Sequence, residues 1–107
     1  EPDGGLLLAT VNGTYAGVAG IRKFTEGDCE LKRMFVRAEY RNLGLGQRLL
    51  TASVELARRL GYAAIKLDTA DFMQAAIRLY RANGFVEIPP YRFNPHDEAR
   101  YFELTLK

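Results

Sequence analysis

The sequence predicts a mixed α/β fold with a mostly antiparallel sheet and a central crossover in which strands alternate with helices. Two apolar, β-rich runs, residues 6–11 and 15–24, flank Asn12-Gly13, a dipeptide that tolerates the positive φ angles of a tight hairpin turn. Later in the chain, strand-like runs alternate with helical patterns, and a strand-helix-strand unit needs a crossover connection. The 107 residues suffice for one domain with one core.

A third strand is predicted at residues 29–37, after a turn signal at residues 25–28. Strict alternation assigns one face to Cys29, Leu31, Arg33 and Phe35, and the other to Glu30, Lys32, Met34 and Val36. Apolar residues then recur at helical spacing between residues 45 and 60. Gly61, which follows them, is typical of the left-handed residue that ends a helix.

The second half of the chain predicts one more helix between short strands. Residues 63–68, 85–88 and 101–106 are strand-like, and the last two runs are separated by a proline-rich connection at residues 89–95. Asp71 is the predicted N-cap of the helix, and Asn83-Gly84 is the predicted stop. The predicted buried side of this helix consists of Phe72, Ala76, Leu79 and Tyr80.

Composition and charge exclude several classes of protein. Hydrophobic residues make up 48% and charged residues 26% of the chain, as in soluble globular proteins, and no apolar run approaches the roughly 20 residues of a membrane span. A single cysteine, Cys29, cannot form an internal disulfide, so a reducing, cytoplasmic setting is expected. The net charge is only +2, yet five basic residues oppose one acid, Glu39, between residues 31 and 50. This local excess predicts an anionic ligand.

The segment Arg41-Asn42-Leu43-Gly44-Leu45-Gly46-Gln47 lies between the third strand and the first helix. Free backbone N–H groups and the positive end of the helix dipole face the same point there, and two glycines leave room for a phosphate group. The alternative is a tight turn that needs glycine for steric reasons alone. The segment lacks the Gly-Lys-Ser/Thr ending of a Walker loop and the third glycine of a dinucleotide fingerprint.

At these residues the sequence resembles the GCN5-related N-acetyltransferase (GNAT) superfamily. Residues 41–46 satisfy its Gln/Arg-x-x-Gly-x-Gly/Ala signature at every fixed position. Residues 30–36 look like the family's central strand, and Ala76-Ile77-Arg78-Leu79-Tyr80 with Gly84-Phe85 looks like its later segment. The resemblance covers essentially the whole chain. It implies transfer of an acetyl group from acetyl-CoA to an amine by direct attack in a ternary complex, without a metal.

The resemblance also implies roles for individual residues. The predicted contacts with acetyl-CoA are made by Met34, Phe35, Val36, Arg41, Asn42, Leu43, Gly44, Leu45, Gly46 and Gln47. Tyr80 matches the general acid that protonates the departing sulfur, and the alternative is a buried aromatic residue with a hydrogen-bonded hydroxyl. Glu30 and Asp68 both match carboxylates that serve as the general base in different branches of the family. Either one is also accounted for by an ion pair with a neighbouring lysine or arginine.

The chain departs from the family in two ways. Family members usually begin with a strand and two helices that help form the acceptor pocket, so residues 1–107 are expected to be a single acetyltransferase-like domain truncated at its N-terminus. Met73 also stands where the family often has a cofactor-contacting asparagine. The predicted acceptor is an amine on a small molecule or a peptide, and a homodimer stays open. Tyr91, Arg92 and Asn94 border the acceptor site if the 89–95 connection lies beside it.

Two rival interpretations remain. A non-catalytic domain of the same fold that binds acetyl-CoA as a sensor or scaffold accounts for the same motifs. A nucleic-acid module is disfavoured, because the basic residues surround a loop that already accounts for an anion. The single histidine, His96, is a predicted solvated loop residue, and one histidine gives no multi-histidine metal site.

Overall fold

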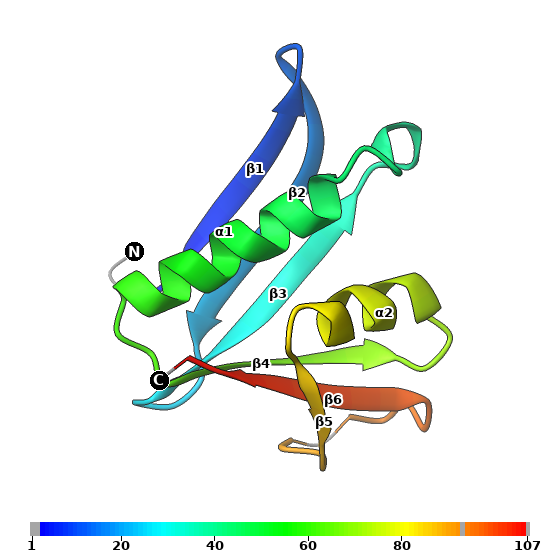
Figure 1. Cartoon of the computed structure of the whole chain (residues 1–107). Helices are drawn as coiled ribbons and strands as arrows, with labels where there is room; N and C mark the ends of the chain where they lie inside the picture. Colours follow the sequence, from blue (N-terminus) through cyan, green and yellow to red (C-terminus); the bar gives the residue numbers. More distant parts are fainter. Residues whose placement is uncertain (1–2, 93, 107) are drawn as a thin grey trace.

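A six-stranded sheet runs through the molecule in the computed structural model, which describes residues 3–92 and 94–106 (Figure 1). Its strands, in the spatial order β1-β2-β3-β4-β6-β5, are β1 (Gly5–Val11), β2 (Thr14–Lys23), β3 (Asp28–Val36), β4 (Ala64–Ala70), β6 (Ala99–Thr105) and β5 (Val86–Ile88). The helices are α1 (Leu45–Arg59) and α2 (Gln74–Ala82), and a 3-10 turn, η1 (Ala38–Tyr40), precedes α1. In the part of the chain described, β3 and β4 pair in parallel and the other neighbours are antiparallel. The predicted mixed, mostly antiparallel fold is confirmed.

The local turn and cap signals give the structures that they predict. Asn12 and Gly13 take φ angles of 50° and 82° at the tip of the β1–β2 hairpin. Gly61 follows α1 with a φ of 88°, and the N–H of the next residue, Tyr62, donates to the carbonyl of Ala57 at 3.1 Å. This is the Schellman arrangement, in which a left-handed residue lets the chain satisfy the last helical carbonyls. Gly84 ends α2 in the same way, with a φ of 91°.

The predicted alternation of β3 is wrong beyond Arg33. This residue has a φ of 59°, and one residue of β2 faces two of β3 between the pairs Val18–Phe35 and Gly20–Lys32. Such a bulge exchanges the two faces of a strand, because the extra residue breaks the period of two. After the bulge, Met34 therefore packs against the core and Phe35 is 47% exposed.

The predicted start of the second helix is also wrong. Asp71 does not cap it, because Asp71 belongs to a turn in which the N–H of Met73 donates to the carbonyl of Ala70 at 3.0 Å. The helix begins at Gln74, and the shift leaves Phe72 70% exposed. Ile77 instead joins Tyr80 on the buried side.

The sheet divides into two arms, each with its own helix. In the α1 arm, α1 lies across β1, β2 and β3 (Figure 1). In the α2 arm, the ring of Tyr80 from α2 lies 6.4 Å from Phe102 of β6 and 5.7 Å from Phe85. Neither described helix has the length and apolar character needed to cross a membrane.

We expect Phe102→Ala to lower the free energy of unfolding by about 3–5 kcal/mol, because its fully buried ring would leave a cavity in the α2 arm. Phe72→Ala is the matched control. The Phe72 ring is 70% exposed, so the same truncation should change stability by less than about 0.5 kcal/mol. Urea unfolding followed by circular dichroism measures both, and equal losses would contradict this assignment of the core.

Candidate active site

A cleft opens between β3 and β4 because the two strands pair over only a short length. Three residue pairs join them, ending at Glu30–Lys66, and beyond that point the strands diverge (Figure 1). The resulting cleft has a volume of about 800 Å³. Nine of the ten residues expected to contact acetyl-CoA line it, namely Met34, Phe35, Val36, Arg41, Asn42, Gly44, Leu45, Gly46 and Gln47. The tenth, Leu43, is 59% exposed and does not line the cleft.

One wall of the cleft is an edge of β3 without a strand partner. From Leu31 to Val36, within the described chain, no residue of β3 pairs with β4. Backbone N–H and C=O groups at such an edge seek partners, so an extended polar ligand can add to it as a strand does. The bulge at Arg33 turns the side chains of Met34 and Val36 toward the core, while the backbone of these residues stays at the edge of the cleft.

The mouth of the cleft is the N-terminus of α1. Gly44 precedes the helix with a φ of 79°, and no side chain caps the first turn. A Cβ added at Gly44 would meet no atom within 4 Å, so the space in front of the helix is open. Uncapped N–H groups and the helix dipole favour an anion here, and Arg41 adds a positive charge to the lining. The side chain of Arg41 is held in place by Nε, which donates to the carbonyl of Val36 at 3.1 Å.

Tyr80 lines the inner part of the cleft. Its side chain is buried against Phe85 and Phe102, and burial raises the pKa of its phenol. The Tyr80 hydroxyl has no hydrogen-bond partner among residues 3–92 and 94–106, and the residue lines the cleft. A phenol in this setting stays protonated and is available to donate to a ligand.

Asp68 lines both the cleft and a second, smaller cavity of about 330 Å³. Its Oδ2 accepts hydrogen bonds from Arg92 Nη2 and Asn94 Nδ2, both at 3.2 Å. Lys32 Nζ lies 3.9 Å from the other carboxylate oxygen. These contacts orient the carboxylate at the junction of the two cavities. The smaller cavity is also lined by Phe72, Asn94, His96 and Glu98.

Glu30, the other predicted base, lines neither cavity. Its carboxylate is fully buried and accepts hydrogen bonds from the Tyr91 hydroxyl at 2.7 Å and from Arg22 at 3.3 Å. Arg92 Nε lies 3.2 Å from Glu30 Oε2 without the alignment of a hydrogen bond, and Lys32 Nζ lies 3.6 Å from Oε1. Burial, followed by the bond to Glu30, raises the pKa of Tyr91. Glu30 therefore fastens the 89–92 segment to the sheet.

The remaining titratable candidates lie apart from the cleft. The side chain of His96 is 73% exposed, and its Nδ1 lies 3.8 Å from Glu98. Cys29 is buried, and burial raises the pKa of its thiol to about 12. In the described part of the chain, no three His, Cys, Asp or Glu side chains gather as a metal site would require. Phe93, in the predicted acceptor border, lies outside the described residues.

One contact at the rim of the cleft carries no sequence signal. The side-chain amides of Gln47 and Asn83 bond to each other, although the two residues stand 36 positions apart. Gln47 is expected from the glycine loop, whereas Asn83 is predicted only as part of a helix stop. Only the three-dimensional arrangement of the two helices brings them together.

The sequence profile of the Acetyltransferase (GNAT) family matches residues 1–85. The chain belongs to this family. Its match to the profile includes β3, the glycine segment, α1 and Tyr80, the same residues that build the cleft. The predicted family membership is confirmed.

Relatives extend the GNAT likeness over the whole chain. An uncharacterized N-acetyltransferase of Schizosaccharomyces pombe is 37% identical over 107 residues, which cover 98% of this chain and 66% of that protein. A GNAT family acetyltransferase from Staphylococcus aureus Mu50 superposes with a TM-score of 0.85 at 32% identity, covering 97% of this chain and 69% of that one. A GNAT family acetyltransferase from Elizabethkingia anophelis with acetyl-CoA bound has the same fold, with a TM-score of 0.83 at 19% identity, covering 97% and 77% of the two chains.

Glu30→Gln should lower the free energy of unfolding by about 1–3 kcal/mol, because the charge-assisted contacts that the buried carboxylate makes with Tyr91, Arg22 and Arg92 would be weakened. Glu26→Gln is the matched control. Glu26 pairs with Lys23 at 2.9 Å, but its side chain is 93% exposed, so the same change should leave stability almost unaltered. Urea midpoints measure the difference, and equal effects would show that the buried network does not brace the fold.

Proposed function

We propose that this GNAT chain transfers the acetyl group of acetyl-CoA to an amine by direct attack in a ternary complex. The observation that carries the proposal is the cleft itself, which joins an unpaired strand edge, an uncapped helix N-terminus and the Tyr80 side chain in one space. Acetyl-CoA has a matching part for each: an amide-containing arm, a pyrophosphate and a thioester. The Elizabethkingia anophelis relative of the same fold has this molecule bound.

In this proposal, each part of acetyl-CoA meets a defined part of the chain. The amide-containing arm pairs with the backbone of β3 between Met34 and Val36. The pyrophosphate accepts hydrogen bonds from the first-turn amides of α1, where Gly44 leaves room for it. The backbone N–H of Met34 donates a hydrogen bond to the thioester oxygen, which gains negative charge during attack.

The reaction requires two proton movements. The acceptor nitrogen forms a bond to the thioester carbon, the carbon–sulfur bond breaks, and its electron pair leaves with the sulfur. Tyr80 donates its phenolic proton to that sulfur. Asp68 takes the proton that the amine loses, directly or through water, because it lines both cavities. Its position favours it over Glu30, whose carboxylate is fully buried and lines neither cavity.

The smaller cavity is the proposed entrance for the amine. It meets the cleft at Asp68 and bears a second carboxylate, Glu98, together with the exposed ring of Phe72. The chain spans 66% of the length of the Schizosaccharomyces pombe relative and 37% of the length of a Dictyostelium discoideum relative.

Gly44→Glu should abolish acetyl-CoA binding, because the carboxylate would occupy the anion position in front of α1. Gly13→Glu is the matched control, since Gly13 also has a positive φ, 82° against 79°, and is also surrounded by open space, but lies at the hairpin tip. Calorimetric titration measures both variants. Loss of binding in both would attribute the effect to backbone strain, and binding by Gly44→Glu would contradict the proposed site.

Tyr80→Phe should lower kcat about 100-fold while acetyl-CoA affinity is kept, as removal of a general acid does. Tyr62→Phe is the control, because the Tyr62 ring is equally buried but its hydroxyl donates to the carbonyl of Asp3. Release of free thiol, followed with a panel of small amines and peptides, measures the rates. Binding without turnover of any amine by the parent chain would favour the sensor interpretation.

The pH dependence of kcat should reflect the raised pKa of Tyr80. Burial raises its pKa, so the phenol remains protonated at pH values where an exposed tyrosine, with a pKa near 10, begins to ionise. Activity should therefore not fall as pH approaches 10. A pH–rate profile of kcat tests this expectation, and an alkaline limb below pH 10 that disappears in Tyr80→Phe would show that the pKa is not raised in the working enzyme.

A further inference from the structure

A pair of side-chain amides joins the two arms at the rim of the cleft. Gln47 Nε2 donates to Asn83 Oδ1 at 2.8 Å, and Asn83 Nδ2 donates to Gln47 Oε1 at 2.9 Å. Gln47 belongs to the first turn of α1, and Asn83 is the C-cap of α2. This amide bridge therefore links the arms at a place other than the β3–β4 pairs, which end at Glu30 and Lys66.

Each amide of the bridge is also anchored within its own helix. Gln47 Nε2 donates to Thr51 Oγ1 at 3.0 Å, and Asn83 Nδ2 donates to the carbonyl of Leu79 at 2.8 Å. Both anchors lie one helical turn away from the amide that they hold. The rotamers of Gln47 and Asn83 are thus fixed before they meet, which reduces the entropy lost on forming the bridge.

The bridge connects the two ends of the proposed reaction site. Gln47 lines the cleft, and its backbone N–H is one of the uncapped first-turn amides. Asn83 stands one turn after Tyr80, bonded to the carbonyl of Leu79. The helices also come within contact distance beside the bridge, since a Cβ added at Gly46 would lie 3.5 Å from Leu79 Cδ2, an ordinary van der Waals separation.

We propose that the Gln47–Asn83 bridge is a positioning device that sets the span between the phosphate-binding turn of α1 and the Tyr80 hydroxyl. The inference rests on the proposed function. The two helices belong to arms that diverge from a short pairing, so a small change in angle at the base moves one helix terminus relative to the other. A ligand that reaches both ends depends on this span, whereas a ligand that occupies the phosphate end alone does not.

The test compares the affinities of coenzyme A and of its fragment 3′-phospho-ADP, which carries the pyrophosphate. Gln47→Met and Asn83→Leu should each weaken coenzyme A binding about 3- to 10-fold, the effect of lost hydrogen bonds. Asn83→Leu, at a residue that does not line the cleft, should change fragment binding by less than about twofold. The exchanged double variant, Gln47→Asn with Asn83→Gln, keeps the summed length of the two side chains and should restore most of the coenzyme A affinity. Calorimetric titration measures both affinities for the parent chain and the three variants.

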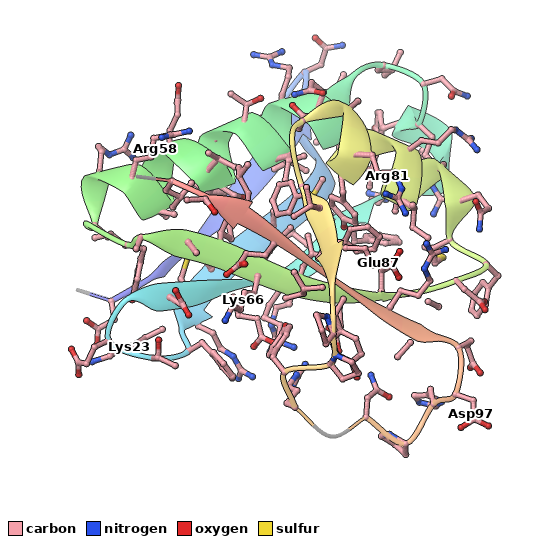
Figure 2. The ribbon with its side chains drawn as sticks, turned by 60° about the horizontal axis from the view of Figure 1, so that its bottom comes forward. Lys23, Arg58, Lys66, Arg81, Glu87 and Asp97 are labelled. Carbon is pink, nitrogen blue, oxygen red and sulfur yellow. The ribbon has the colours of Figure 1, made fainter. Side chains whose placement is uncertain are left out.

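Arg81→Gln is the control for loss of a polar contact on the same helix. Arg81 Nη2 bonds to Glu87 Oε1 at 3.1 Å, which joins α2 to β5 within one arm, and Figure 2 shows the two side chains on these neighbouring elements. Neither affinity should change in this variant. For enzymatic turnover, the bridge variants should show a lower kcat at saturating acetyl-CoA, and the exchanged variant should recover it.

The outcomes separate this inference from the proposed function. Parallel losses for coenzyme A and the fragment in Asn83→Leu, no loss for either ligand, or no recovery in the exchanged variant would each overturn the positioning role while the parent still binds coenzyme A. A folded parent that does not bind coenzyme A would overturn the proposed function, and the inference with it. Thermal melts establish that each variant is folded, and Asn83→Ala takes the place of Asn83→Leu if the latter unfolds.

Discussion

The rest of the structure depends on how little of β3 pairs with β4. Three residue pairs, from Asp28–Ala64 to Glu30–Lys66, are enough to make one sheet of six strands. Beyond them the backbone of β3 has one edge without a strand partner, and backbone polar groups that lack partners are costly unless water or a ligand serves them. The divergence therefore creates both the space of the cleft and the hydrogen-bonding groups that line it.

The short pairing is reinforced from the side of the 89–92 segment. Glu30 occupies the last pair before the strands separate, and its buried carboxylate would be strongly destabilising alone. Arg22 of β2, Tyr91 and Arg92 compensate it from three directions. Arg92 also reaches Asp68 of β4, so one connected set of charges spans the point where the arms separate. Breaking any member leaves the others underpaired, which explains how a polar cluster can brace a fold without adding apolar area.

What the sequence predicts well is what short stretches of chain decide. Asn12-Gly13, Gly61 and Gly84 need left-handed backbone for local reasons, and their structures follow from that need. The bulge at Arg33 escapes prediction because a non-glycine residue with a φ of 59° is held there by pairing with β2, not by its own preference. The exposure of Phe72 is likewise not predicted, because the turn at Asp71 places Phe72 before the first residue of α2.

In the candidate site, too, features set by local sequence can be predicted and features set by long-range contacts cannot. The position of the glycine segment 41–47 at the uncapped N-terminus of α1 can be predicted, because it depends on local sequence alone. The different placements of Glu30 and Asp68 cannot, because both are carboxylates on strands and only long-range contacts distinguish them. The same limit applies to Asn83, whose partner lies 36 residues away.

The charges of the two cavities fit the two substrates of the proposed reaction. The larger cleft is lined by Lys32, Arg33 and Arg41 against one acid, Asp68, which suits a donor that carries phosphate groups. The smaller cavity has no lysine or arginine in its described lining and contains Asp68 and Glu98, which suits an amine that arrives as an ammonium ion. Asp68 is common to both linings. In the proposed reaction, a carboxylate at that junction would attract the cationic acceptor to the place where it loses a proton, and the bonds from Arg92 and Asn94 hold the carboxylate in that orientation.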